Sequence, residues 1–261
     1  MPRLAANLSW LYQEHALEKR FEAAAADGFA AVEMLFPYAQ AHAAQFGRWL
    51  DYAGISCALI NAPAGDWAAG ERGLAALAGR ESDFRASLLL ALDYAAAIGC
   101  PRVHVMSGVL PWNGDRAAAR SACLANLHWA APQAEGRGIT LTIEPINPRD
   151  MPGYFLNRQD EALALIDEVG SPALRLQLDA YHCQIVEGDV LAHVRRAFET
   201  GVLAHVQVAG VPRRHEPMDD EYGELFSYLD SVGYAGFVGC EYKPRAGTSE
   251  GLDWAGAWLK R

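Results

Sequence analysis

Four polar residues end apolar runs in the second half of the chain. Glu144 follows ITLTI, Asp179 follows LRLQL, Gln207 lies within AHVQVAG, and Glu241 follows FVGC. If these runs are parallel strands of one sheet, their carboxyl ends meet at one edge, which is where catalytic residues gather in barrel enzymes. We therefore expect the four side chains to be neighbours.

Alternation along each run supports an inward orientation of these side chains. Residues two apart in a strand share a face, so a polar residue also precedes three of the four on the same face. These preceding residues are Thr142, Gln177 and His205. The residues between them are apolar, so we expect apolar side chains to face outward and polar side chains to face the centre of the sheet.

Three carboxylates that converge in a buried site repel one another unless a positive charge compensates them. Three carboxylates and an amide oxygen form a hard, all-oxygen ligand set that suits Mg²⁺ or Mn²⁺, whereas zinc prefers nitrogen or sulfur ligands. One such residue alone could equally cap a helix or pair with an arginine. Four at equivalent positions on successive runs favour one divalent metal site.

The elements that carry these residues repeat one unit, in which a helix is followed by a glycine and an apolar strand. The glycines expected to end the helices are Gly28, Gly54, Gly99, Gly138, Gly170, Gly201 and Gly233. With the first run, RLAANLS, they give eight strands in 261 residues. This predicts an α/β fold, a single (β/α)8 TIM barrel over residues 1–261, with a long loop at 63–80. An open doubly wound sheet would need a glycine-rich turn after its first strand, and NLSWLYQEH has none.

Composition limits the possible partners and compartment. The net charge is −10 and the only lysines are Lys19, Lys243 and Lys260, so a nucleic-acid partner is not expected. The five cysteines are scattered without a CxxC pair, which favours reduced, buried thiols and a cytoplasmic location. The first residues have too short an apolar run for a signal peptide, and no stretch is long enough to cross a membrane.

Several sequence blocks resemble the hydroxypyruvate isomerase family, which lies within the xylose-isomerase-like barrels. The most specific blocks are EPIN…PGYFL and EYKPR, and NLSWL, PAGDWAAGERG, LQLDAYHCQ and HVQVAGVPRRHEP also match, so that the resemblance covers essentially the whole chain. It implies a metal held by Glu144, Asp179, Gln207 and Glu241, with Glu144 and Glu241 as the acid/base pair. Related ketose 3-epimerases usually carry His where Gln207 stands, which favours the isomerase branch.

The implied reaction interconverts hydroxypyruvate and tartronate semialdehyde through an enediolate, with the two glutamates moving the proton. Three further residues are candidates for contact with this small hydroxy-carbonyl acid. His182 follows Asp179 by three residues, and Arg213 follows Gln207 at the spacing of a substrate-contacting arginine in the related epimerases. Lys243 follows Glu241 by two residues, which on strand parity faces inward. A backbone-bonded histidine, a surface arginine and a simple Glu–Lys pair are the alternatives.

Other polar residues have structural interpretations. We expect His104 and His205 to be hydrogen-bonded in the barrel interior rather than to bind metal. Glu33 either supports the site from behind or caps a loop. In the long loop, Glu71 and Arg72 either close over the substrate or pair with each other. The aromatic residues Trp67, Trp112 and Tyr154 either line the pocket or pack the loop against the barrel.

Four other functions share parts of this pattern. An isomerase of four-carbon 2-oxo acids such as 2-oxo-tetronate, and a ketose 3-epimerase, would use the same site on another substrate. A metal-dependent apurinic endonuclease would need a histidine-rich multi-zinc cluster and a basic face, which the sequence lacks. A non-catalytic binding barrel would be expected to have lost one of the paired glutamates. A homo-oligomer, as a dimer or tetramer, is common in the resembled family, and the sequence does not locate its interface.

Overall fold

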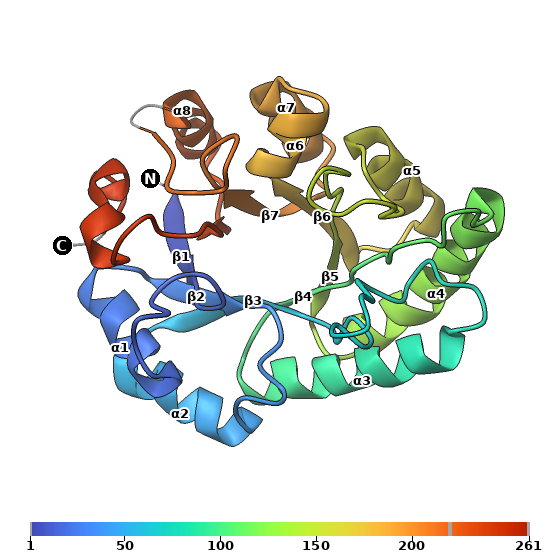
Figure 1. Ribbon diagram of the computed structural model, residues 1–261, viewed down its shortest axis with the longest axis horizontal. Helices are drawn as coiled ribbons and strands as arrows, with labels where there is room; N and C mark the ends of the chain where they lie inside the picture. The colour runs from blue at the N-terminus through green and yellow to red at the C-terminus, as the bar shows by residue number, and fades with distance from the viewer. Residues whose placement is uncertain (1, 219–220, 260–261) are drawn as a thin grey trace.

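The computed structural model describes residues 2–218 and 221–259. Eight parallel strands pair in sequence order, and β8 closes onto β1 to form a barrel. Figure 1 shows the helices arranged around this ring of strands. The predicted single (β/α)8 barrel is confirmed.

The strands are short and the helices between them longer. The strands are β1 Arg3–Asn7, β2 Ala31–Met34, β3 Ser56–Asn61, β4 Arg102–His104, β5 Thr140–Ile143, β6 Leu174–Asp179, β7 Leu203–Val208 and β8 Phe237–Cys240. The helices are α1 Leu17–Ala26, α2 Ala43–Ala53, α3 Glu81–Ala97, α4 Arg116–Glu135, α5 Gln159–Val169, α6 Ala180–Val186, α7 Val190–Glu199 and α8 Gly223–Ser231, followed by 3₁₀ turns at Ser249–Gly251 and Asp253–Ala255. Two helices therefore follow β6, and the 3₁₀ turns follow β8.

The seven glycines predicted to end helices all have positive φ angles, between 65° and 93°. A side chain is strained in this left-handed region, so a glycine there lets the chain reverse into the next strand. The position of each glycine sets where the next strand begins. It therefore also sets which residues lie at the carboxyl end of that strand.

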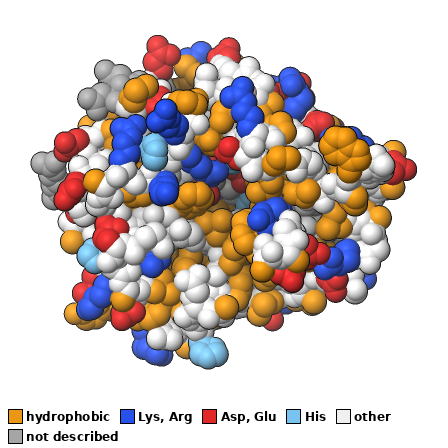
Figure 2. Space-filling model, viewed as in Figure 1, with side chains coloured by type: hydrophobic (Ala, Val, Ile, Leu, Met, Phe, Trp, Pro, Cys, Tyr) orange, Lys and Arg blue, Asp and Glu red, His pale blue; other side chains and the backbone are white. Residues whose placement is uncertain are grey.

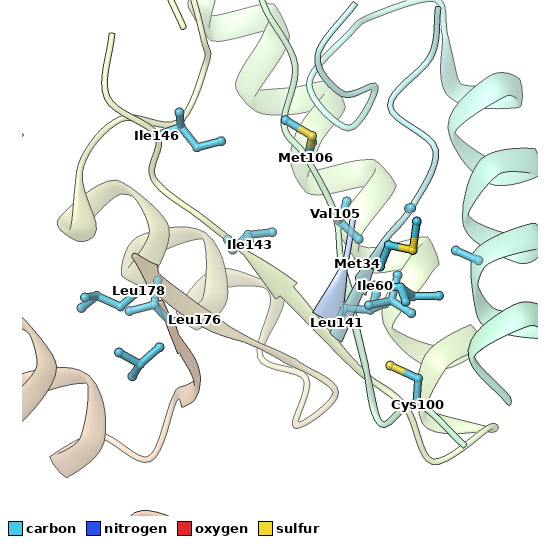
Figure 3. Packing of buried hydrophobic residues seen from close by; sticks show 14 of the residues in the cluster. Met34, Ile60, Cys100, Val105, Met106, Leu141, Ile143, Ile146, Leu176 and Leu178 are labelled. Atoms are coloured by element: carbon cyan, nitrogen blue, oxygen red, sulfur yellow. The ribbon is translucent and has the colours of Figure 1, made fainter. Parts of the chain in front are cut away.

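Apolar side chains on the outer face of the strands form the main core with the helices. Figure 3 shows Leu176 and Leu178 together on β6, and Leu141 and Ile143 on the neighbouring β5. All four are at most 2% exposed. These are the outward positions that the alternation predicted, which leaves Glu144 and Asp179 on the other face.

Inside the barrel the packing changes from apolar to polar along the strands. Ala5, Ala31, Ala58 and Phe237 form a separate small cluster from β1, β2, β3 and β8. Two residues further along β1 and β2, on the same face, stand Asn7 and Glu33. The barrel interior therefore has an apolar floor below a polar layer.

The long loop predicted at 63–80 is present between β3 and α3. All five cysteines are free and buried, as expected. Among the described residues, no helix has the length and apolar character that crossing a bilayer demands.

Candidate active site

The carboxyl ends of the strands bring three carboxylates to one place. Glu144 directly follows β5, Asp179 ends β6, and Glu241 directly follows β8, and all three are at most 8% exposed. Ligand atoms of Glu144, Asp179 and His182 lie within 4.8 Å of one another. The strand ends therefore position the side chains that the sequence pattern singled out.

Arg214 is the cation that Asp179 and Glu241 share. Its Nη2 lies 3.0 Å from Glu241 Oε1 and 3.3 Å from Asp179 Oδ2, and its Nε donates to the Glu241 carbonyl oxygen at 3.2 Å. Its guanidinium also lies 5.1 Å from the ring centres of Trp10 and Tyr181. Arg214 thus ties the end of β6 to the end of β8 across the mouth of the barrel.

Each glutamate keeps one carboxylate oxygen unengaged. Glu241 Oε1 accepts from Trp10 Nε1 at 3.2 Å and contacts Arg214, while its Oε2 has no partner within the described ranges. Glu144 Oε2 accepts from Gln177 Nε2 at 3.2 Å. In the part of the chain that the structure describes, Glu144 Oε1 is buried and has no hydrogen-bond partner. An orphaned, buried acceptor of this kind is the observation that points to a ligand.

Burial controls the protonation of the three carboxyl groups. It raises the pKa of Glu241 to about 8, although the charge of Arg214 opposes this shift. Burial and the neighbouring charge of Asp179 hold the pKa of Glu144 well above its usual value, and burial also raises the pKa of Asp179. One arginine does not offset three carboxylates, so this site favours an additional cation.

A polar chain beneath the carboxylates crosses the barrel interior. Gln177 donates to Gln207 Oε1 at 2.8 Å, and Gln207 donates to Glu33 Oε1 at 2.7 Å. Glu33 also accepts from Asn7 Nδ2 at 3.0 Å and lies 2.6 Å from His205 Nε2. Glu33 therefore supports the site from behind, which was one of its two sequence interpretations. His205 is hydrogen-bonded in the interior, as expected.

Gln207 is buried in this chain, and both ends of its amide are engaged. An amide oxygen has two lone pairs, so Gln207 Oε1 can accept from Gln177 and still face a metal ion. Carboxylate and amide oxygens suit a hard divalent cation by their chemistry, and within this set Glu144 and Asp179 have ligand atoms within 4.8 Å of each other.

His182 lies in the site, as the sequence suggested. Its Nδ1 is 2.6 Å from Asn147 Nδ2, and its Nε2 is 3.1 Å from Arg214 Nη1 and 3.6 Å from Asp179 Oδ2. Burial lowers the pKa of His182 well below its usual value, and Arg214 adds to this effect. A neutral His182 therefore accepts from the Arg214 guanidinium without adding charge to the site.

Two predicted substrate-binding residues are not brought to this pocket. Arg213 is exposed, and its neighbour Arg214 occupies the site instead. Arg214 has a φ of +55°, which turns the chain so that the second arginine of the pair faces inward. Lys243 is also exposed, because β8 ends at Cys240 and strand parity does not continue to residue 243. Its backbone amide donates to the Arg214 carbonyl oxygen at 2.8 Å.

Sequence reasoning also missed the position of His104 in the pocket wall. Burial lowers its pKa to about 3, so this side chain is neutral. Its Nε2 has no hydrogen-bond partner within the described residues and lies 3.5 Å from Glu144 Oε2. His104 lines the pocket rather than being satisfied in the interior. Its position at the end of β4, level with the other strand ends, was the signal that could have shown this.

Glu144 and Glu241 line a cavity of about 280 Å³, whereas Asp179 and Gln207 lie behind its wall. Its other walls include Trp10, Asn61, Met106 and Ile146, together with Trp67 and Arg72 from the loop after β3. Trp112, in contrast, is fully exposed, and the buried Tyr154 accepts from the Ser107 backbone amide at 2.8 Å. Figure 2 shows a hollow near the middle of the face seen in Figure 1, with basic side chains around it. The cavity is smaller than the roughly 300–1,000 Å³ of sites for drug-sized ligands, so it suits a small molecule.

Comparison with known proteins places this barrel and site in a family. The model of the family described as xylose isomerase-like TIM barrel matches residues 21–260. The chain belongs to the xylose isomerase-like TIM barrel family.

Proteins that are similar over nearly the full length show where this chain lies within the family. The chain is 57% identical, over 100% of both chains, to a protein of Cupriavidus necator named 2-oxo-tetronate isomerase. It is 40% identical to the hydroxypyruvate isomerase of Escherichia coli, over 97% of this chain and 98% of the relative. The resemblance to the hydroxypyruvate isomerase family is thereby confirmed.

A crystal structure from Brucella melitensis, described as an AP endonuclease of family 2, is 45% identical. It superposes with a TM-score of 0.95 over 100% of both chains. The barrel architecture is therefore shared along the full length with an experimental structure.

Proposed function

We propose that this chain is an isomerase of short 2-oxo acids that carry a hydroxyl group on the next carbon. The observation that carries the proposal is the pair Glu144 and Glu241, each buried at the mouth of the barrel with one unengaged carboxylate oxygen. Full-length similarity to proteins named hydroxypyruvate isomerase and 2-oxo-tetronate isomerase supports it. Hydroxypyruvate and 2-oxo-tetronate share the reacting group, a carbonyl at C2 beside a hydroxyl at C3.

The reaction removes one proton from C3, adds one to C2 and leaves the formula unchanged. One glutamate, through Glu144 Oε1 or Glu241 Oε2, removes the C3 proton, and the substrate becomes an enediolate. The other glutamate returns a proton to C2, while the C3 hydroxyl loses its proton to become a carbonyl and the C2 oxygen gains a proton to become a hydroxyl. For hydroxypyruvate the product is tartronate semialdehyde.

Other residues of this chain orient the two glutamates. His182, which contacts Asn147 through Nδ1 and Arg214 through Nε2, lines the cavity and holds Arg214 in place beside Glu241. Arg214 and Trp10 fix Oε1 of Glu241, so that Oε2 faces the cavity. Gln177 fixes Oε2 of Glu144 in the same manner. Both reacting oxygens are thereby preorganised before the substrate binds.

We propose that one divalent ion, Mg²⁺ or Mn²⁺, is held by Glu144, Asp179, Gln207 and Glu241. Such an ion supplies positive charge where the oxygens of the substrate become negative. The burial of three carboxyl groups beside a single arginine, and the raised pKa values of all three, support this assignment.

The similarity to the Cupriavidus necator protein favours a four-carbon substrate over hydroxypyruvate. The test is to follow hydroxypyruvate and 2-oxo-tetronate separately by proton NMR with Mg²⁺ or Mn²⁺. Glu144→Gln and Glu241→Gln serve as active-site variants, and Glu18→Gln, an exposed glutamate, as the matched control. We expect the wild type to convert both acids, with the higher kcat/KM for 2-oxo-tetronate. Glu144→Gln and Glu241→Gln should each lose conversion, whereas Glu18→Gln should retain it. Turnover of neither acid by the wild type would refute the proposal.

A further inference from the structure

Arg72 is a cation of the pocket without an acidic partner. The pocket is lined by two arginines, and Arg214 is committed to Asp179 and Glu241. Across residues 2–218 and 221–259, no carboxylate pairs with Arg72. The adjacent Glu71 is paired with Arg80 instead. The Glu71–Arg72 pair considered from the sequence is therefore not formed, and the charge of Arg72 remains available to a ligand.

The hydrogen bonds of Arg72 leave one edge of its guanidinium unoccupied. Nη1 donates to the carbonyl oxygens of Trp67 and Glu71, at 2.9 and 2.7 Å. The guanidinium carbon lies 3.8 Å from the ring centre of Trp67, which fixes the plane of the group. Nε and Nη2 remain, and these two parallel N–H groups match the two oxygens of a carboxylate.

The loop around Arg72 is held in place independently of any ligand. The Glu71 carboxylate accepts from the Asp66 amide at 2.6 Å, and a Cβ on Gly65 would stand 2.1 Å from Glu71 Oε2. On the other side of Arg72, Gly73 forms an antiparallel bridge with Ser107, beside β4. Arg72 is thus anchored on both sides, and a guanidinium held in this way loses little freedom when it binds an anion.

The charged side chains of the cavity favour one orientation of a bound anionic substrate. Glu144 and Glu241 lie at the mouth of the barrel, and Asp150 contributes a further carboxylate to the wall. A substrate carboxylate is repelled by Asp150 and attracted by Arg72, which pairs with no carboxylate among the described residues. If C2 and C3 lie at the two glutamates, the carboxylate must then point toward the loop that carries Arg72.

We propose that Arg72, stacked on Trp67, binds the carboxylate of the substrate side-on and selects 2-oxo acids over neutral ketoses. This inference rests on the proposed isomerase function for the orientation of the substrate. It assigns to the loop at 63–80 a role in specificity, whereas the strand ends carry the chemistry.

The test compares a charged ligand with its neutral counterpart in a binding measurement. Pyruvate lacks the C3 hydroxyl and cannot undergo the reaction, and pyruvamide replaces its carboxylate by an uncharged amide. Their affinities are measured by calorimetry with Mg²⁺ present, for the wild type, Arg72→Leu and Arg72→Lys. Arg85→Leu is the matched control, because Arg85 also stacks on a tryptophan, Trp129, on the helical surface.

We expect the wild type and Arg85→Leu to prefer pyruvate by about tenfold or more, the value of one charge-assisted bidentate contact. Arg72→Leu should bind both ligands with nearly equal affinity, and Arg72→Lys should restore part of the preference. In the isomerase assay, Arg72→Leu should raise KM by about tenfold and change kcat much less.

Retention of the full preference for pyruvate in Arg72→Leu would overturn the proposal. A fall in kcat with an unchanged KM would also overturn it. The two proposals can fail separately. If the wild type isomerises neither acid but prefers pyruvate to pyruvamide, and Arg72→Leu lacks this preference, the proposed reaction fails while the carboxylate site stands.

Discussion

Arg214 Nη2 lies 3.0 Å from Glu241 Oε1 and only 3.3 Å from Asp179 Oδ2, so one guanidinium group holds two carboxylates from different strands. This contact joins β6 to β8 at the mouth of the barrel, although the two residues it contacts are 62 positions apart in the sequence. It also fixes which oxygen of Glu241 faces the cavity. The position of Arg214 is therefore central to both the stability and the activity that we propose.

Replacement of Arg214 by Met should lower kcat/KM about 100-fold, as the loss of an electrostatic group from a buried site does. Removal of the cation also leaves Asp179 and Glu241 uncompensated, which costs about 3 kcal/mol of unfolding free energy. Enzyme assays and denaturant unfolding measure the two effects. The exposed Arg213→Met is the comparison, and it should retain activity and stability. Equal losses in the two variants would contradict the placement of Arg214.

Glu33→Gln should destabilise the barrel by about 2–4 kcal/mol. Glu33 is fully buried and accepts from Asn7 and Gln207 while it contacts His205. A glutamine presents an amide N–H₂ to these groups and leaves at least one buried polar atom unsatisfied. Urea unfolding measures the loss, and the exposed Glu18→Gln should stay within about 0.5 kcal/mol of the wild type. A shift of similar size in both variants would show that Glu33 does not organise the interior.

The same carboxylate explains a glycine on β8. A Cβ at Gly239 would stand 2.4 Å from Glu33 Oε2. The side chain of Glu33 crosses the interior at this level, so no other residue type fits at position 239 without displacement of the polar chain. The sequence FVGCE thus carries its glycine and its active-site glutamate for two different reasons.

Chelation should lower the thermal stability of the protein, and Mg²⁺ or Mn²⁺ should restore it. An ion that binds the folded state alone, at 100 times its Kd, contributes about 2.7 kcal/mol. For a chain of this size the shift in Tm is then roughly 5–10 °C. Differential scanning calorimetry with and without metal measures this shift. Asp179→Asn should lose the response, whereas the exposed Asp51→Asn should keep it. If the Tm of the wild type is the same with and without either metal, the proposed metal site is refuted.

Stability should decline at alkaline pH as Cys123 ionises in the unfolded chain. Burial raises the pKa of Cys123 from 9.0 to about 12 in the folded protein. Between these values the unfolded state loses a proton that the folded state keeps, so the unfolding free energy falls as pH rises above about 9. Denaturant unfolding from pH 8 to 11 measures the slope. Cys123→Ala should show a shallower decline than the wild type, and an unchanged slope would contradict this role of Cys123.

The strand ends could be predicted from the sequence because two regularities apply to them. The period of two along a strand separates Glu144 from Leu141 and Ile143, and parallel strands place all their carboxyl ends on one side. The glycines with positive φ mark where each strand begins. Together these rules brought Glu144, Asp179 and Glu241 to one site without knowledge of any contact.

The loops could not be predicted in this way, because no period governs them. Arg213 and Arg214 differ by one position, and the positive φ of Arg214 decides which of them faces the cavity. Lys243 lies beyond the end of β8, where strand parity no longer holds. Arg72 has no acidic partner among the described residues because Glu71 contacts Arg80 and Asp66 instead, and only the folded loop shows these contacts.

The most direct test of the two-glutamate account is the isotope found at C2 of the product when the reaction runs in D₂O. If one glutamate removes the C3 proton and the other supplies the C2 proton, the supplied proton comes from solvent. Proton NMR and mass spectrometry should then show one deuterium at C2 of each product molecule formed by the wild type. A product that carries only the hydrogen of the substrate at C2 would indicate direct transfer between the carbons, and it would contradict the assignment of Glu144 and Glu241 as acid and base.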